Sequence, residues 1–278
     1  MQKQGKFNEA LDLFQRCVDL AIQFDLRTIL PTSLIDLGKA LSQSGKLDIA
    51  LETIQCFAEV FDDPVNKKSL VDCFINWGRN LHYQNRTKEA VFILKRASEI
   101  VQDLNNQHSL AEVLNGLGWL LRQQQKWVEA EEVYQRSKDI CEDLDEADDL
   151  LGVTLHNLGL VLDKQNKWDE AEKMLRYSYN LSVKLEDHRG QAMILNSLGQ
   201  LIQKQGEEKL QLALMYFRAS IKLGEQVNDR GHLAKAHTTM GNTLLKYGKI
   251  DEAIEELRQG FEIDESLVNG FGMIKITR

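Results

Sequence analysis

Residues 114–137 read LNGLGWLLRQQQKWVEAEEVYQRS, and residues 155–178 read LHNLGLVLDKQNKWDEAEKMLRYS. Each stretch contains a glycine that is followed twelve residues later by an alanine. These two small residues recur every 40 to 42 positions, as Gly38, Gly78, Gly118, Gly159, Gly199 and Gly241 and as Ala10, Ala50, Ala90, Ala130, Ala171, Ala213 and Ala253. A fixed period of this length indicates a small structural unit stacked on copies of itself.

One unit, residues 111–151, shows the expected secondary structure. At 100° per residue, its first half carries an apolar helical stripe formed by Leu114, Leu117, Gly118 and Leu121. After the polar residues 124–126, a second stripe consists of Trp127, Ala130, Tyr134, Ser137 and Ile140. The pattern predicts two amphipathic helices joined by a short turn, with Trp127 and its counterpart Trp168 packed in the core.

The repeated glycine and alanine have a steric explanation. They place the smallest side chains where two helix axes must approach to about 8–10 Å. An apolar residue follows each alanine by four positions, as Tyr134 does after Ala130. Two extra residues separate Gly206 from Ala213, and we expect this insertion to lie in a turn.

This register resembles the tetratricopeptide repeat family, in which a Leu-Gly pair marks the first helix of each unit and an alanine marks the second. HEAT and armadillo repeats share the period but not the register. The period of forty exceeds the usual 34 residues, and the proline that commonly ends a repeat is absent. Long units of this kind are similar to those of kinesin light chains and bacterial tetratricopeptide signalling proteins. The resemblance implies an all-α solenoid, a right-handed superhelix of antiparallel helix pairs.

The organisation is predicted to be a single array over residues 1–278, because no Pro/Gly/Ser-rich linker interrupts it. It divides into a partial unit at 1–30, full units at 31–70, 71–110, 111–151, 152–191, 192–233 and 234–273, and the start of a further unit at 274–278. Neither end shows a polar capping helix. We therefore expect a piece of a longer protein, in which exposed terminal helices could support self-association.

Composition excludes several classes of partner. The formal net charge is −8, so a nucleic-acid footprint, which needs a basic stripe, is not expected. No apolar run is long enough to span a bilayer. The four cysteines form no CxxC pair, which favours reduced thiols in a cytoplasmic protein. The acidic run at residues 142–149 is predicted to be a solvated turn, with a docking site for a basic partner as the alternative.

Motifs for catalysis or cofactor binding fail on inspection. The G-x-G at Gly116 has Leu121 in place of a third glycine, and Gly248-Lys249 is followed by Ile250 instead of Ser or Thr. His232 and His237 are five residues apart, about 140° around a helix, so they cannot share a metal ion. We expect His237 to be a buried, hydrogen-bonded core residue. The sequence predicts no enzymatic activity, no catalytic residue, no metal and no cofactor.

Binding is expected on the first helix of each unit, because the resemblance implies that these helices line the concave groove of the superhelix. The helical wheel independently leaves one face of each first helix unused in packing. The predicted partner-binding residues are Asn76, Arg79, Asn115, Trp119, Arg122, His156, Asn157, Asn196, Gln200, Asn242 and Lys246. Asparagine suits a peptide backbone because it both donates and accepts hydrogen bonds. Trp119 is the predicted apolar anchor.

Three functional hypotheses follow. The first is a non-catalytic scaffold that holds a peptide or partner protein in the groove. The second is the sensor or autoinhibitory arm of a larger effector, such as a STAND-type ATPase or a protease. The third is a structural spacer that binds nothing through its groove.

Overall fold

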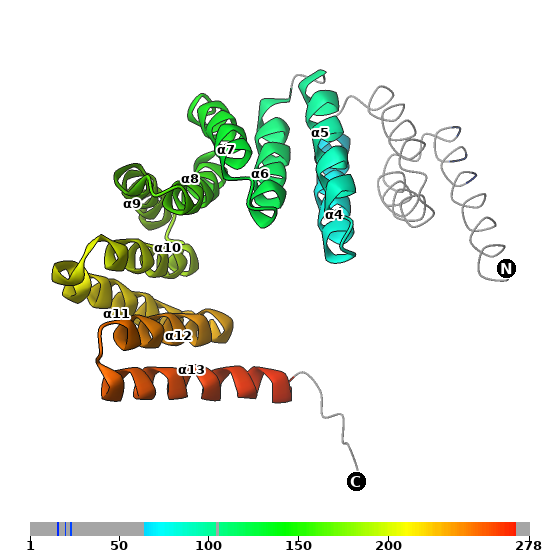
Figure 1. Cartoon of the computed structure of the whole chain (residues 1–278). Helices are drawn as coiled ribbons and strands as arrows, with labels where there is room; N and C mark the ends of the chain where they lie inside the picture. Colours follow the sequence, from blue (N-terminus) through cyan, green and yellow to red (C-terminus); the bar gives the residue numbers. More distant parts are fainter. Residues whose placement is uncertain (1–15, 17–19, 21–22, 24–63, 104–105, 271–278) are drawn as a thin grey trace, which may run out of the picture. The chain divides into compact units, whose positions relative to one another are not determined.

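The computed structural model of the chain describes residues 16, 20 and 23 and the segments 64–103 and 106–270 (Figure 1). Predictions for the units at 1–30 and 274–278, and for most of 31–70, lie outside these residues. The described segments are all-α and contain ten α-helices. Their bounds are α4 Pro64–Tyr83, α5 Thr87–Asp103, α6 Gln107–Gln123, α7 Trp127–Glu142, α8 Asp148–Lys164, α9 Trp168–Lys184, α10 His188–Ile202, α11 Leu210–Gln226, α12 Arg230–Lys246 and α13 Ile250–Gly270.

The helices pack in sequential antiparallel pairs, and we call the first helix of each pair A and the second B. The pairs are α4–α5, α6–α7, α8–α9, α10–α11 and α12–α13. The chain divides into two compact units, Met1–Leu144 and Asp145–Arg278, which we describe separately. The division falls in the acidic run at residues 142–149, most of which forms the turn between α7 and α8, as predicted.

The repeated glycine is the point of closest contact within a pair. A Cβ atom added to Gly159 would lie 2.8 Å from Cγ of Leu175, and one added to Gly118 would lie 2.7 Å from Cζ of Tyr134. The same contact joins Gly199 to Phe217 and Gly241 to Leu257. Because real Cβ atoms do not approach this closely, glycine is required for the side chain of helix B to cover the backbone of helix A.

A buried serine adds a second repeated contact. The hydroxyls of Ser137, Ser178 and Ser220, each seven residues after the alanine, donate to the carbonyl oxygens of Ala111, Gly152 and Ala192 at 3.0, 2.7 and 2.7 Å. Each accepting carbonyl lies seven residues before the glycine of its A helix. These bonds satisfy hydroxyls that would be costly to bury alone, and they hold the two helices in one register.

The turns within the pairs share a left-handed residue. Asn85, Gln125, Asn166 and Gly248 have φ between 58° and 73°, and the next residue donates its amide to a carbonyl five positions earlier, as Lys126 does to Leu121. This is the Schellman arrangement that ends a helix. In the fourth pair, α10 ends at Ile202 and the insertion forms two short 3₁₀ helices, Gln203–Gln205 and Glu207–Lys209. The insertion therefore lies between the helices, as predicted.

The phase of the repeat differs from the prediction. Units were predicted to begin at residues 71, 111, 152, 192 and 234, but these positions lie inside A helices that begin earlier. Side chains of Asn106, Asp187 and Asp229 accept from the backbone amides of Ser109, Gly190 and His232, and so cap three A helices. The period sets the spacing of the pairs, whereas the capping residues set where each A helix starts.

Several single-residue predictions are tested by burial. His237 is buried and its Nδ1 lies 2.8 Å from Oε2 of Glu256, which confirms the core assignment. Cys141 is buried and is not part of a disulfide, as expected. Trp127 and Trp168 are half-buried, so their predicted packing in the core is confirmed only in part. They occupy the first position of helix B, at the edge of the contact between helices.

His232 forms a second buried contact in the Asp145–Arg278 unit. Its Nε2 lies 2.8 Å from the Ser220 hydroxyl, which itself donates to a carbonyl and therefore accepts from the imidazole. Burial lowers the pKa of His232 below its ordinary value of 6.5, and the charge of Asp229 only partly opposes this. The ring is thus held neutral between α11 and α12.

No helix within the described segments is long and apolar enough to cross a membrane. The prediction that the chain does not span a bilayer is consistent with this finding for that part of the chain.

Two glycines of α8 provide a matched test of the packing. We expect Gly159→Ala to lower the free energy of unfolding by about 1–3 kcal/mol through overpacking against Leu175. Gly152→Ala should raise it by up to about 1 kcal/mol, because its Cβ would meet only Leu181 Cβ at 3.8 Å and alanine favours helix. Urea titration checks both variants. Equal effects of the two substitutions would contradict the assigned role of Gly159.

Acidification should destabilise the fold through His232. The unfolded chain binds a proton as pH falls below about 6.5, whereas folded His232 resists protonation. The free energy of unfolding is therefore expected to fall with pH below this value, and His232→Gln should show a shallower fall over the same range. Denaturant titrations between pH 7.5 and 5.5 check this. An identical slope in the variant would show that another group causes the dependence.

Candidate binding surface

Four positions on each A helix are never buried in the part of the chain that the structure describes. Counted from the repeated glycine, they lie six and two residues before it and one and five residues after it, so they share one helical stripe. We call this the A stripe. In the Met1–Leu144 unit it consists of Asp72, Asn76, Arg79 and Tyr83 on α4 and of Glu112, Gly116, Trp119 and Gln123 on α6. In the Asp145–Arg278 unit it consists of Val153, Asn157, Leu160 and Lys164 on α8, of Met193, Ser197 and Gln200 on α10 with Lys204 in the 3₁₀ helix that follows, and of Lys235, Thr239, Asn242 and Lys246 on α12.

The neighbouring edge of the A helix faces the next A helix within each unit, as α4 faces α6 and α8 faces α10. This A edge comprises the residues three before and four after the glycine. In one unit, the ring of His82 on α4 meets that of Trp119 on α6 edge to face, with centroids 5.1 Å apart. In the other, His156 Nε2 on α8 lies 2.9 Å from the hydroxyl of Ser197 on α10, and Asp163 accepts from Lys204. These contacts place consecutive A stripes side by side within each unit.

Seven of the eleven predicted binding residues lie on the A stripe. They are Asn76, Arg79, Trp119, Asn157, Gln200, Asn242 and Lys246. The other four, Asn115, Arg122, His156 and Asn196, lie on the A edge. A wheel drawn for a single helix cannot separate these two positions, because they are adjacent and both are polar. The contact with the next A helix separates them.

The prediction for Asn115 and Asn196 needs correction. Both were predicted to lie on a face not needed for packing, but their side chains are only 9% and 3% exposed. Asn196 Oδ1 is buried without a hydrogen-bond partner in the described residues. These asparagines are covered by neighbouring helices, so they are poorly placed to read a ligand backbone directly.

The A stripe of the Met1–Leu144 unit has an aromatic centre. Trp119 is half-buried, with one edge against His82, whose Nδ1 is 3.1 Å from the Thr87 hydroxyl. Tyr83 follows at a position that is 74% exposed. The His82 and Trp119 rings hold each other in place, and this fixes the part of Trp119 that remains in solvent. Sequence reasoning identified Trp119 but overlooked Tyr83, which the same helical spacing would have revealed.

Arg122 lies beside this centre, one turn after Gly118. Its Nε is buried without a hydrogen-bond partner in the described residues, as is the hydroxyl of Tyr134. Burial raises the pKa of Tyr134 far above its ordinary range, although the positive charge of Arg122 lowers it somewhat. A partly buried guanidinium with this arrangement is suited to hold an acceptor such as a carboxylate.

The Asp145–Arg278 unit presents different chemistry. At the N-terminal ends of its A helices, Val153 and Met193 are exposed apolar side chains. At the C-terminal ends stand three lysines, Lys164, Lys204 and Lys246, of which Lys204 pairs with Asp163. Asn157 and the other polar stripe residues lie between. Apolar contact at one end and cationic contact at the other are therefore available to a single extended ligand.

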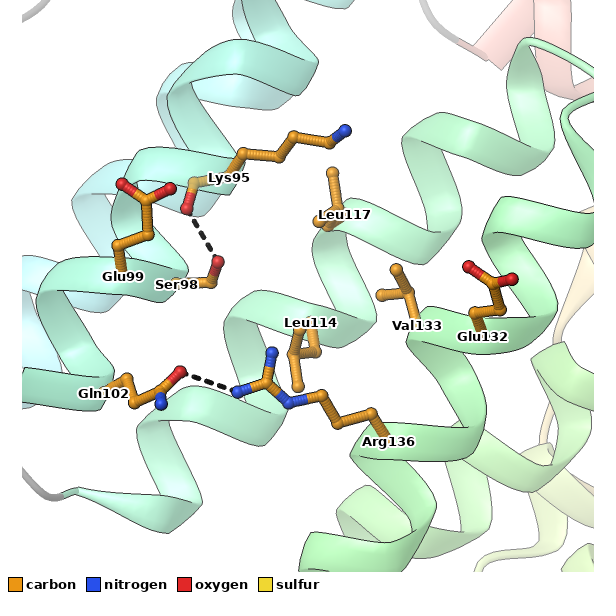
Figure 2. Close-up of a pocket in the computed structure, with 9 residues that line it drawn as sticks. All are labelled: Lys95, Ser98, Glu99, Gln102, Leu114, Leu117, Glu132, Val133 and Arg136. Atoms are coloured by element: carbon orange, nitrogen blue, oxygen red, sulfur yellow. Dashed lines mark hydrogen bonds between the residues drawn. The ribbon is translucent and has the colours of Figure 1, made fainter.

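A separate pocket of about 350 Å³ lies between α5, α6 and α7 (Figure 2). Leu114 and Leu117 line it from α6, and Arg136 donates to Gln102 across it at 2.7 Å. Its charged lining is balanced, with Lys95 and Arg136 against two glutamates. None of its residues belongs to the A stripe, and the Arg136–Gln102 hydrogen bond joins two of its lining residues. We do not assign it a ligand.

Within the described residues, no group of three or more His, Cys, Asp or Glu side chains is arranged to hold a metal ion. The absence of enzymatic activity and of a cofactor stays a prediction. The arrangement of exposed side chains described above is suited to contact a polypeptide.

The fold and stripe define the class of helix-pair repeat proteins whose A helices present a common face. The tetratricopeptide repeat family pattern matches residues 69–143, 109–184 and 190–266. The chain belongs to the tetratricopeptide repeat family. A sequence search among curated proteins finds no match.

Solved structures share the fold at low sequence identity. BtubC (BKLC) from P. vanneervenii has a TM-score of 0.67 and 16% identity, covering 82% of this chain and 91% of that one. Repeats of a putative kinesin light chain from Podosopora anserina give 0.58 and 15%, covering 71% and 96%. A Rap protein complexed with competence and sporulation factor gives 0.63 and 16%, covering 93% and 74%. The predicted similarity to kinesin light chains and to bacterial tetratricopeptide proteins is thus confirmed for the fold.

Proposed function

We propose that this protein is a non-catalytic interaction scaffold that binds an extended polypeptide along its A stripes. One observation carries the proposal: the same four positions, counted from the repeated glycine, stay unburied in all five described A helices. A surface that packing leaves free, and that repeats on adjacent helices, can contact a chain at several points.

The residues on the stripes support a polypeptide ligand. Trp119 combines a large apolar face with a restrained ring, which is typical of binding hot spots. Asn157 and Gln200 supply donors and acceptors for a peptide backbone. The lysines of the second unit, together with Arg79 and Arg122 of the first, favour a ligand that carries carboxylates.

One solved structure with this fold, that of a Rap protein, is a complex with competence and sporulation factor. Because its sequence identity is low, this structure is a precedent for the fold alone. The ligand of the present chain is therefore inferred from its own residues. The sensor-arm hypothesis would use the same stripes and differs only in what adjoins the array.

Peptides selected from a random library against the wild-type protein provide the test. Trp119→Ala combined with Asn157→Ala should weaken their binding by about 2 kcal/mol or more, roughly thirtyfold, as measured by calorimetry. Phe92→Ala combined with Met215→Ala is the matched control, because it removes one exposed side chain from a B helix in each unit. The control should bind as wild type.

Two results would contradict the proposal. If the control loses affinity and the A-stripe variant does not, the ligand lies on the B helices. If neither folded variant binds any selected peptide more weakly than the wild-type protein does, the spacer hypothesis gains support. Circular dichroism of each variant confirms that a loss of binding is not a loss of fold.

A further inference from the structure

Four large apolar side chains are exposed together at the last described pair of the Asp145–Arg278 unit. Leu245 on α12 is 44% exposed, and Ile250, Ile254 and Phe261 on α13 are 59%, 58% and 62% exposed. We call these four residues the end face. Exposed apolar groups that cluster on adjoining helices commonly mark an interaction surface.

The repeat itself shows what normally covers such a face. Ile250, Ile254 and Phe261 lie three residues before, one after and eight after the repeated alanine of α13. The same positions on α11 are Leu210, Leu214 and Ile221, and they are 6% exposed, 1% exposed and half-buried. Leu210 and Leu214 belong to a core cluster with Met240 and Leu244 of α12. These positions of α11 are therefore buried against an A helix, α12.

The α12 side of the end face gives the same result. Leu245 lies four residues after its glycine, on the A edge. The corresponding residue of α10, Gln203, is half-buried, and its carbonyl accepts from the Tyr247 hydroxyl at 2.6 Å. The A edge of α8 likewise contacts α10 through His156 and Ser197. Both helices of the last pair thus expose residues whose counterparts in the same unit meet the next A helix.

The charges on α13 indicate which kind of helix would complement the end face. Residues 250–264 of α13 contain six acidic side chains and one basic side chain, Arg258, which already pairs with Glu255 and Glu262. A second copy docked through the same face would bring these carboxylates together. A helix with Lys or Arg beside its apolar ridge would instead complement them.

We propose that the end face binds an amphipathic helix of a partner protein, seated on α12 and α13 as α12 is seated on α10 and α11. The partner helix presents an apolar ridge like that of α12, and basic residues flank the ridge. This site is distinct from the A stripes, and its occupant is helical instead of extended.

The probe for this proposal is a labelled synthetic peptide with the sequence of residues 230–247, the chain's own example of such a helix. It contains Arg230, Lys235 and Lys246 and no acidic residue. Fluorescence anisotropy with the full chain should show saturable micromolar binding. Changing the three basic residues of the peptide to Glu should weaken binding at least tenfold, and added salt should weaken the original peptide.

Two double variants of the protein separate the end face from general effects of charge. Ile254→Glu with Phe261→Glu should reduce peptide binding at least tenfold. Leu212→Glu with Met215→Glu adds the same charge to exposed positions of α11 and should leave binding unchanged. Hydrogen exchange of the wild-type complex gives a readout that does not depend on variant folding, with new protection expected over residues 250–264.

Each alternative has its own signature. Absence of binding, or binding that both double variants weaken equally, would overturn the proposal. Protection confined to α10 and α11 would mean that the peptide has displaced α12 from its own position on these two helices. Concentration-dependent self-association that Ile254→Glu with Phe261→Glu abolishes, and that the peptide does not disrupt, would assign the face to a second copy of the chain.

Discussion

The contact between a large side chain of helix B and the glycine of helix A determines the rest of this structure. At Gly118 the ring of Tyr134 lies directly on the helix backbone, and at Gly159 the side chain of Leu175 does the same. No larger residue fits at these glycines without moving the helices apart. A glycine inside a helix costs about 1 kcal/mol relative to alanine, and this close packing offsets that cost. Every other surface of the A helix is oriented by that one contact.

Once the glycine faces helix B, helical geometry assigns the remaining positions. Residues three before and four after it turn toward the next A helix, as His82 does toward Trp119. The positions six and two residues before the glycine and one and five residues after it remain unburied and form the A stripe. Binding capacity is thus a by-product of the repeat, because a regular solenoid necessarily leaves one face of each A helix uncovered. What that face binds depends on residues that the fold does not constrain.

The two units use this freedom differently. The Met1–Leu144 unit concentrates aromatic and guanidinium groups around Trp119, whereas the Asp145–Arg278 unit combines Met193 and Val153 with a row of lysines. The last pair adds a face of another kind, on which Ile254 holds a position that is core in α11 and Phe261 holds one that is half-buried there. A repeat protein can therefore carry separate recognition surfaces, one along its stripes and one where its stacking face is exposed.

The sequence by itself determined the helix pairs, the contact positions within them and the turn that receives the insertion, because these follow from periodicity and from the size of single residues. Seven of the eleven residues that it predicted lie on the A stripe, including Trp119 and Asn157. It did not determine the start of each A helix, which depends on capping at residues such as Asp187. Only the tertiary structure showed that Asn115 and Asn196 are buried. The reason is physical: a helical wheel records the direction of a side chain, but burial depends on which neighbouring helix occupies that direction.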